Sequence, residues 1–158
     1  PSKTIVGEGF TVCIYFRILN YGVYNDTFLV TAYADNHIIA TQIVSVPTRN
    51  STTISFTWNT TGFAYGNYTV WAYAWPIPEE TDTTDNMLAY DGFIQVVISG
   101  DVDGDWKVTM GDVVALCDCF GSTPGKPRWD PNCDINDDLK IGMDDIIIAC
   151  DHFGQHYP

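Results

Sequence analysis

Oxygen-bearing side chains recur at fixed spacing in the last third of the sequence, in two twelve-residue segments that begin 33 positions apart. Each segment places Asp or Asn at positions 1, 3, 5 and 12, a main-chain carbonyl at position 7 and an apolar residue at position 8. This is the ligand pattern of a calcium loop, in which a hard cation gathers about six to eight oxygens. Because two registered copies match, we expect two bound calcium ions. The predicted ligands are Asp101, Asp103, Asp105, Lys107, Thr109 and Asp112 in the first loop, and Asp134, Asn136, Asp138, Lys140 and Asp145 in the second, with the lysines offering their carbonyls.

The two loops depart from the usual pattern at three positions. Position 6, where glycine normally makes a sharp turn, is Trp106 in one loop and Leu139 in the other. A bulky residue at positive φ costs on the order of 1 kcal/mol or more. Position 12 is Asp and not the longer Glu, and Gly142 at position 9 leaves a place for water. With four charged ligands against three, the first loop is expected to bind calcium more tightly.

An apolar segment follows each loop, over residues 113–120 and 146–153. Gly121 and Gly154 stand where a helix needs a left-handed cap. The repeat therefore predicts two small loop–helix units.

Residues 1–99 contain short segments typical of β-strands, separated by turn signals. Residues 10–18 alternate, with apolar side chains at the even positions, and residues 27–34, 38–46, 51–58, 68–75 and 91–98 are further predicted strands. So many strands in under 100 residues indicate a β-sandwich. The composition changes near Gly100, which favours two domains, 1–99 and 100–158. The short connection between them predicts a fixed angle between the domains.

The C-terminal repeat resembles a type I dockerin, in which each loop carries Asp at position 12 and has no helix before it. The resemblance covers about residues 100–155, and the segment Phe120-Gly-Ser-Thr-Pro-Gly-Lys-Pro-Arg-Trp129-Asp-Pro-Asn is similar to the linker between the two units of archaeal relatives. It implies a paired, EF-hand-like calcium fold that docks onto a β-sandwich partner, a cohesin.

The N-terminal region resembles the CARDB family of immunoglobulin-like adhesion modules of archaeal and bacterial surface proteins. The residues that carry the likeness are Gly7-Glu-Gly-Phe10, Asn20-Tyr-Gly22, Phe56-Thr-Trp58, Gly66-Asn-Tyr68-Thr-Val70 and Glu80-Thr-Asp82-Thr-Thr-Asp85-Asn86. The family implies adhesion or spacing and no catalysis. The expected fold is therefore an all-β immunoglobulin-like sandwich followed by a small α module of two calcium loop–helix repeats.

Charge and cysteine content limit the possible functions and compartments. The net charge is −13, with −5 in residues 1–99 and −8 in residues 100–158, and an excess of this sign repels nucleic acid and anionic membranes. No apolar run is long enough to span a membrane. Five cysteines and four clustered N-glycosylation sequons favour an extracellular or cell-surface location. The sequon asparagines are Asn25, Asn50, Asn59 and Asn67.

The cysteines of the module allow more than one interpretation. Cys117, Cys119, Cys133, Cys150 and His152 could bind zinc, but no Cys-x-x-Cys pair occurs and disulfides suit the compartment better. Cys117 and Cys150 hold equivalent positions in the two repeats, so we expect a Cys117–Cys150 bridge, with Cys119–Cys133 as the second. Four cysteines allow three pairings, so sequence alone does not decide. Cys13 is expected to be buried in a strand, with a free thiol available to another chain as the alternative.

No arrangement of residues predicts catalysis. The three histidines stand in no triad order, and Glu79, Glu80, Asp82 and Asp85 read as a solvated loop in preference to a glycosidase pair or a third cation site. The strand aromatics are expected mainly in the core, although either Trp71, Tyr73 and Trp75 or the small residues between them must face outward. Exposed aromatics would mark a partner surface.

Two functions of different classes remain open. The first is a non-enzymatic structural protein whose module docks onto the β-sandwich of the next identical subunit and builds a head-to-tail filament or surface assembly. Its expected contacts are Met110, Met143 and Phe153 on the module, and on the sandwich either an aromatic outer face or a strand edge near Pro1. The alternative is an accessory or carbohydrate-binding subunit, anchored through its module to a separate cohesin scaffold.

Overall fold

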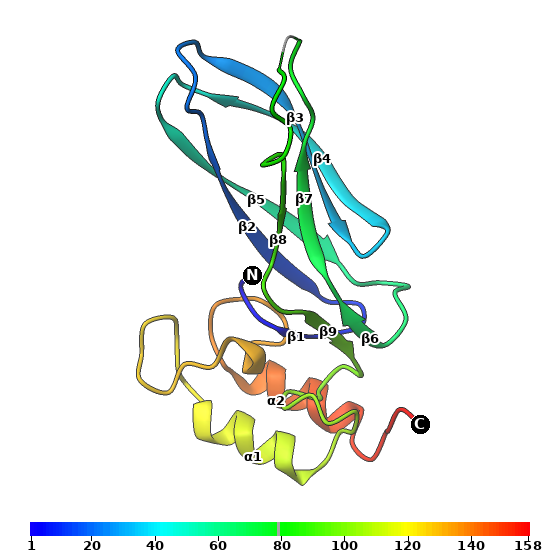
Figure 1. Ribbon diagram of the computed structural model, residues 1–158. Helices are drawn as coiled ribbons and strands as arrows, with labels where there is room; N and C mark the ends of the chain where they lie inside the picture. Colours follow the sequence, from blue (N-terminus) through cyan, green and yellow to red (C-terminus); the bar gives the residue numbers. More distant parts are fainter. Residues whose placement is uncertain (79) are drawn as a thin grey trace. The chain divides into compact units, whose positions relative to one another are not determined.

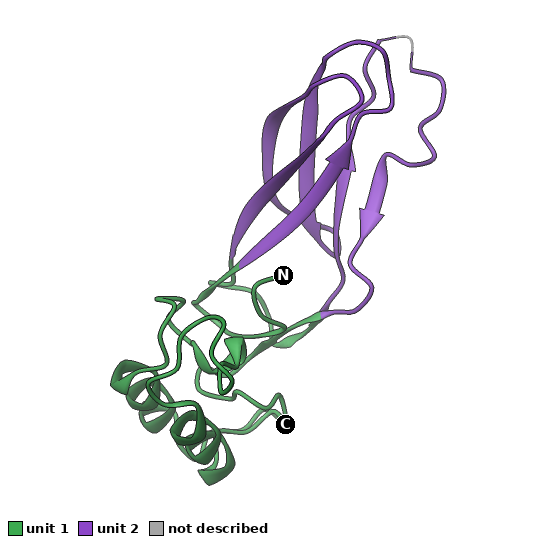
Figure 2. Cartoon of the chain, turned by 90° about the vertical axis from the view of Figure 1, so that its left-hand side faces the viewer, with its two compact units in different colours: residues 1–12, 59–67, 94–158 green, residues 13–58, 68–93 purple. Residues whose placement is uncertain are grey.

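The computed structural model describes residues 1–78 and 80–158 of the chain (Figure 1). Glu79, which belongs to the acidic loop singled out above, lies outside the described residues. The chain forms two compact units (Figure 2). Unit 1 gathers Pro1–Val12, Asn59–Asn67 and Ile94–Pro158, and unit 2 comprises Cys13–Trp58 and Tyr68–Phe93.

The strands that build unit 2 belong to two sheets. The smaller sheet pairs β2 (Thr11–Leu19) with β5 (Ser51–Asn59). The larger sheet is antiparallel in the order β4 (His37–Val46), β3 (Asp26–Ala34), β7 (Val70–Ala74) and β8 (Met87–Ala89). Most of these strands match the predicted segments. The three-residue strand β8 was not predicted, because it lies beside the polar loop and has no apolar alternation of its own.

The inward residues of the two sheets form the core of unit 2. Val12, Ile14 and Phe16 are at most 5% exposed and Ile18 is partly buried, so the predicted apolar even positions of β2 face the core. Phe16 meets Phe56 edge to face, with ring centroids 6.2 Å apart, and Trp58 meets Tyr68 in the same way at 5.4 Å. Such edge-to-face pairs add to the stability gained from apolar burial.

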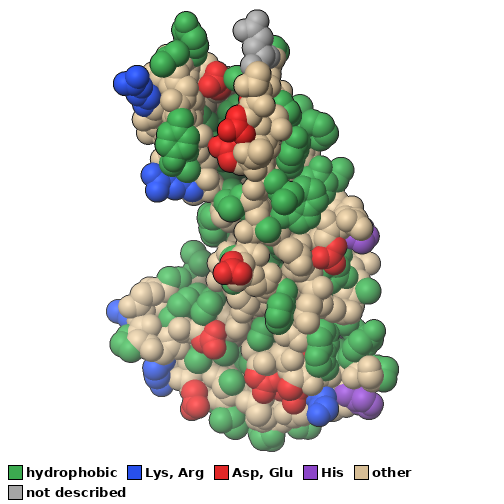
Figure 3. Space-filling view, in the orientation of Figure 1, with side chains coloured by type: hydrophobic (Ala, Val, Ile, Leu, Met, Phe, Trp, Pro, Cys, Tyr) green, Lys and Arg blue, Asp and Glu red, His purple; other side chains and the backbone are tan. Residues whose placement is uncertain are grey.

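The row of aromatic residues on β7 lies on the outer face of the larger sheet. Val70 and Ala72 point inward and are buried, whereas Trp71 and Tyr73 are partly exposed and Trp75 is 48% exposed. The Trp71 ring stacks on Tyr33 of β3, with centroids 4.0 Å apart. The expectation of core packing was therefore wrong for this row, because strand alternation assigns the larger side chains to the outside. Hydrophobic side chains gather on the surface here (Figure 3).

Unit 1 combines a small sheet with the predicted helical repeat. The sheet has the order β1 (Ile5–Gly7), β9 (Ile94–Val97), β6 (Gly66–Tyr68), and β1 runs parallel to β9. The helices are α1 (Met110–Cys119) and α2 (Met143–Asp151), with the 3-10 helix η1 (Pro131–Cys133) between them. Gly121 and Gly154 have φ values of 75° and 83°, which confirms the predicted left-handed caps.

A separate hydrophobic core fills the helical part of unit 1. Leu116 of α1 and Ala149 of α2 are fully buried. Phe10 and Tyr65, which come from the N-terminal half of the chain, pack against the same cluster. Its buried members are Ile98, Val102, Val108, Leu116, Cys133, Ile135, Ile141 and Ala149.

The connection at Gly100 is buried within unit 1. Gly100 has a φ of 104°, and a Cβ there would lie 2.6 Å from the Cα of Ala149, so only glycine fits without a shift. Residues on both sides of Gly100 thus belong to one compact unit, whereas the composition changes at this glycine. The division of the chain into domains 1–99 and 100–158 stays a prediction.

Within the described part of the chain, no helix is long and apolar enough to cross a membrane.

Candidate metal centre

The first loop closes around its own carboxylates. Asp101 accepts hydrogen bonds from the main-chain N–H groups of Gly104 and Trp106, at 2.7 and 2.9 Å. Asp112, at the start of α1, accepts from Val102 N–H at 2.9 Å with one oxygen and from Thr109 N–H at 2.8 Å with the other. Positions 1 and 12 are therefore held together at the base of the loop, and both carboxylates are buried.

The second loop repeats this arrangement except at one bond, because one donor to the position-1 carboxylate comes from position 5 here and from position 4 in the first loop. Asp134 accepts from Asp138 N–H at 3.1 Å and from Leu139 N–H at 3.0 Å. Asp145 accepts from the N–H groups of Ile135 and Gly142, both at 2.8 Å. Two segments 33 positions apart thus fold into closely similar hydrogen-bonded loops, as their matched sequences predict.

Position 6 of each loop adopts the left-handed conformation that the calcium-loop pattern requires. Trp106 has a φ of 70° and Leu139 a φ of 67°. Position 4 is also left-handed in both loops, at Gly104 and Asp137. Left-handed residues at positions 4 and 6 turn the main chain sharply, which lets the side chains of positions 1, 3 and 5 converge.

Burial and like charge act together on the carboxylates of the first loop. Desolvation by burial, with the neighbouring charges of Asp112 and Asp103, raises the pKa of Asp101 to about 6. Burial also raises the pKa of Asp103 and, in the second loop, of Asp134. A raised carboxyl pKa means that the negative charge is unfavourable where it stands. A bound cation would remove that penalty.

The donor set of the first loop fits a hard cation. Carboxylate oxygens of Asp101, Asp103 and Asp105 lie within 4.8 Å of one another, and every predicted donor is an oxygen. A carboxylate has about four lone-pair sites, so the hydrogen bonds inside the loop leave oxygen positions for a metal. The Thr109 hydroxyl accepts a hydrogen bond from Gly111 N–H at 3.1 Å and so caps α1. The ligand roles of all these residues stay predictions.

Sequence reasoning missed two residues that hold the second loop. Lys3 is 3% exposed, and its ammonium donates to the carbonyls of Asp134 and Ile135 at 2.7 and 3.2 Å. It lies 3.7 Å from the Asp137 carboxylate. The side-chain oxygen of Asn132 accepts from Thr4 N–H and Ile5 N–H at 3.0 and 3.1 Å. Nothing in the local sequence marks Lys3, because its partners lie more than 130 positions away.

The cysteines of unit 1 fall into two kinds of environment. Cys133 is buried, and burial with the adjacent Cys119 thiol, to which it is hydrogen-bonded, raises the pKa of Cys133. Cys117 and Cys150 are exposed. All four are free thiols in the structure, and the predicted bridges Cys117–Cys150 and Cys119–Cys133 stay predictions. Among the described residues, three His, Cys, Asp or Glu side chains lie close enough together to share a metal ion only at Asp101, Asp103 and Asp105, a group that contains no cysteine.

The four sequon asparagines, Asn25, Asn50, Asn59 and Asn67, are all exposed. Their glycosylation stays a prediction. In the acidic loop, Glu80, Asp82 and Asp85 are also exposed, and hydrogen bonds from Thr84 lower the pKa of Asp82.

Comparison with known proteins gives likenesses to solved structures. No protein-family model matches the sequence, and no curated protein matches it. The chain is similar to the CARDB domain of a Pyrococcus furiosus protein in complex with di-metal ions, at 18% identity and a TM-score of 0.49, over 60% of this chain and 80% of that one. It is also similar to a domain of a putative cell surface protein from Methanosarcina acetivorans, at 25% identity and a TM-score of 0.47, over 61% and 83%. A type II cohesin–X-dockerin complex from Acetivibrio cellulolyticus matches at 18% identity and a TM-score of 0.32, over 94% and 97%.

Proposed function

We propose that this is a non-enzymatic extracellular structural or adhesion protein whose C-terminal module is folded by two calcium ions and docks onto a β-sandwich. The observation that carries the proposal is the duplicated loop, in which equivalent carboxylates are held by equivalent main-chain hydrogen bonds. Two loops in this arrangement suit calcium binding better than catalysis, because their carboxylates accept main-chain hydrogen bonds within the loops themselves.

The module also offers a surface for a partner. Exposed apolar side chains stand at position 10 of both loops, where the helices begin: Met110 and Met143 are 61% and 58% exposed. Phe153, which follows α2, is 52% exposed. Val114 of α1 and Ile147 of α2, one turn after the two methionines, are about half exposed as well. Large exposed apolar groups in a repeated arrangement are typical of protein contact surfaces. The partner we propose is a β-sandwich, in the first instance that of the next identical subunit.

The calcium part of the proposal is tested by calorimetric titration of metal-free protein, with circular dichroism at 222 nm as the second readout. We expect two binding events and a higher melting temperature for the helices, since binding to the folded state alone adds RT ln(1 + [L]/Kd) of stability. Asp112→Asn should remove the tighter event and Asp145→Asn the weaker one. Unchanged helix stability after full removal of calcium would refute the proposal.

A second candidate function rests on the outward aromatic row of unit 2. Trp75 is 48% exposed, and its indole N–H is bonded to the Thr31 hydroxyl at 3.0 Å, so the ring is fixed in place. A fixed exposed ring can stack on a sugar, which would suit a carbohydrate-binding accessory subunit. Affinity electrophoresis against a panel of neutral polysaccharides tests this. If a polysaccharide slows the migration of the wild type and of Ile43→Ala, a variant on the same face, but not that of Trp75→Ala, the result would support carbohydrate binding.

A further inference from the structure

The inner face of the larger sheet is incompletely covered at one end of unit 2. Val30 and Ala72 are buried on this face, at 2% and 6% exposure, but Phe28 and Ala74, two residues along each strand, are only partly buried. Leu88 of β8 is paired with Ala72 and so faces the same inner side, yet it is 54% exposed. Inward apolar side chains are thus left without a cover at this end.

A strand edge lies beside the uncovered face. At one end of the β2–β5 pair, the main-chain N–H of Asn20 donates to the carbonyl of Asn50, and at the other end the N–H of Thr60 donates to the carbonyl of Phe10. Both bonds fit the same antiparallel alignment of the two strands. In an antiparallel pair, alternate residues point their N–H and C=O groups to the same partner strand. The even positions of β2 therefore bond β5, and the main-chain groups of Arg17 and Leu19 face the other way. Within the described part of the chain, no strand other than β5 pairs with β2.

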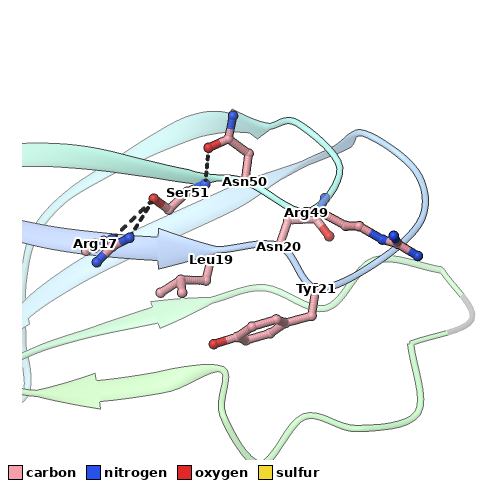
Figure 4. Close-up of a pocket in the computed structure, with 7 residues that line it drawn as sticks. All are labelled: Arg17, Leu19, Asn20, Tyr21, Arg49, Asn50 and Ser51. Carbon is pink, nitrogen blue, oxygen red and sulfur yellow. Dashed lines mark hydrogen bonds between the residues drawn. The ribbon is translucent and has the colours of Figure 1, made fainter.

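The edge and the uncovered face enclose a groove of about 730 Å³. Its walls are β8 and residues 16–22, which form the end of β2 and the start of the loop after it, and its floor is formed by Phe28, Val30, Ala72 and Ala74. Figure 4 shows Leu19 and Tyr21 extending from the end of β2 toward the neighbouring strands of the larger sheet. The Arg17 guanidinium is turned aside to the Ser51 hydroxyl, at 3.1 Å, in a smaller adjoining pocket of about 480 Å³.

Four carboxylates stand around the groove, those of Asp26, Glu80, Asp82 and Asp85. Acidic side chains are visible at this end of unit 2 in Figure 3. Arg17 is the one basic residue among the described groove residues. The groove therefore combines three features: an apolar floor, a row of main-chain donors and acceptors along one wall, and a negative rim.

We propose that this groove binds an extended, basic segment of a partner protein, which adds to the edge of β2 as a further strand. Strand addition supplies main-chain hydrogen bonds at Arg17 and Leu19, and alternate apolar side chains of the segment cover Ala74 and Leu88. Lysine or arginine residues at its ends meet the acidic rim. The partner is a different protein, because this chain carries a net charge of −13 and its own N-terminal strand β1 is already paired with β9.

The proposal is independent of the calcium module and is tested with the full chain in calcium. A phage-displayed random library of peptides about nine residues long, close to the length of a strand, is selected on the protein. We expect the enriched sequences to alternate Val, Ile or Phe with polar residues and to carry Lys or Arg at their ends. In the complex with the synthesised best peptide, the amides of Arg17 and Leu19 should gain protection from hydrogen exchange.

Two matched variants distinguish specific binding in the groove from non-specific adsorption of the peptide. Leu88→Asp places a charge on the groove wall and should weaken peptide binding about tenfold or more, since one buried charge or lost apolar contact readily exceeds 1.4 kcal/mol. Leu29→Asp alters a leucine of similar exposure, 44%, on the opposite face of the same sheet and should leave binding unchanged. Both sites are already solvated, so both variants should fold, as equal melting temperatures will show.

Several outcomes would overturn the proposal. The phage selection could enrich peptides that are neither alternating nor basic. The best peptide could bind the Leu88→Asp variant as tightly as it binds the wild type. It could also bind without protecting the Arg17 and Leu19 amides from hydrogen exchange. If a fluorescent fatty acid binds the protein more tightly than the peptide and the two compete, the groove is a site for an acyl chain instead.

Discussion

The carboxylate of Asp101 is the residue whose chemistry depends most on the cation. Its side chain is 3% exposed, and in the metal-free fold its pKa is raised from 3.8 to about 6. The folded state then binds the proton more tightly than the unfolded state. This contribution to stability is fully present below about pH 3.8 and is lost as the pH rises through about 6.

We therefore expect the metal-free helices to become less stable between pH 5 and pH 7, at up to about 1.4 kcal/mol per pH unit for one group. Burial raises the pKa of Asp103 and Asp134 as well, which acts in the same direction. Urea unfolding followed at 222 nm measures the effect. Saturating calcium should reverse the trend, because the ion binds the deprotonated loop. Asp101→Asn should flatten the metal-free profile, and a metal-free protein that is more stable at pH 7 than at pH 5 would contradict this account.

Lys3 is a second residue with a defined energetic role. Its ammonium satisfies two main-chain carbonyls of the second loop, and burial lowers its pKa although the Asp137 and Asp134 carboxylates oppose the shift. Lys3→Met keeps the apolar stem and removes the donor. Because buried acceptors are then left unpaired, we expect a loss of about 1–3 kcal/mol in the unfolding free energy of the helices.

Lys126→Met is the control for this change, since Lys126 is exposed in the segment between the two loops and has no such partner among the described residues. Chemical denaturation in calcium compares the two variants with wild type. Equal stability of Lys3→Met and Lys126→Met would show that the N-terminal segment does not hold the loop.

At the scale of the elements, the left-handed residues at loop position 6 offer a test of backbone strain. Leu139 has a φ of 67° and is 61% exposed, so its side chain contributes little packing. Leu139→Gly removes strain of roughly 1–2 kcal/mol but raises the entropy of the unfolded chain, which costs about 0.5–1 kcal/mol. We expect a net stabilisation of up to about 1 kcal/mol in thermal unfolding.

The neighbouring substitution Lys140→Gly is the matched control, because Lys140 is not among the residues with positive φ. It should destabilise the protein by about 0.5–1 kcal/mol, the cost of added chain freedom alone. If both glycine variants lose stability equally, position 6 is not strained.

The elements also show how far local pattern can predict this structure. The alternation in β2 and the caps at Gly121 and Gly154 follow from residue type and spacing, and both were predicted. The left-handed turns at Trp106 and Leu139 agree with the loop spacing but not with residue type, because bulky side chains disfavour that conformation. The contacts of Lys3 and Asn132 were not, because they join segments far apart in the chain. The outward row at Trp71 was misjudged, since alternation separates two faces without telling which one is buried. The groove beside β2 exists because one edge of this strand is left without a partner strand. Strand pairing is a long-range property, so no local sequence feature predicts it.

At the scale of the whole molecule, the mode of assembly is the main open prediction. Residues from both ends of the chain belong to unit 1, and β1 is paired with β9, so exchange of residues 5–7 between subunits would have to break an existing parallel pair. The helix surface marked by Met110 and Met143 carries no such cost, because both side chains are already exposed. We therefore expect self-docking to use the helices in preference to the N-terminal strand.

A contact between the helices of one subunit and the sandwich of the next joins different surfaces, so it closes into rings or grows into filaments. In calcium, light scattering should give a mass above the 17.6 kDa monomer that rises with concentration, and electron microscopy should show rings or fibres. The double variant Met110→Lys, Met143→Lys should stay monomeric, because each lysine places a charge in an apolar contact. Val23→Lys, at a site 63% exposed in unit 2 and outside the groove, should assemble like wild type. A wild-type monomer that persists at high concentration would leave docking to a separate scaffold protein as the function of the module.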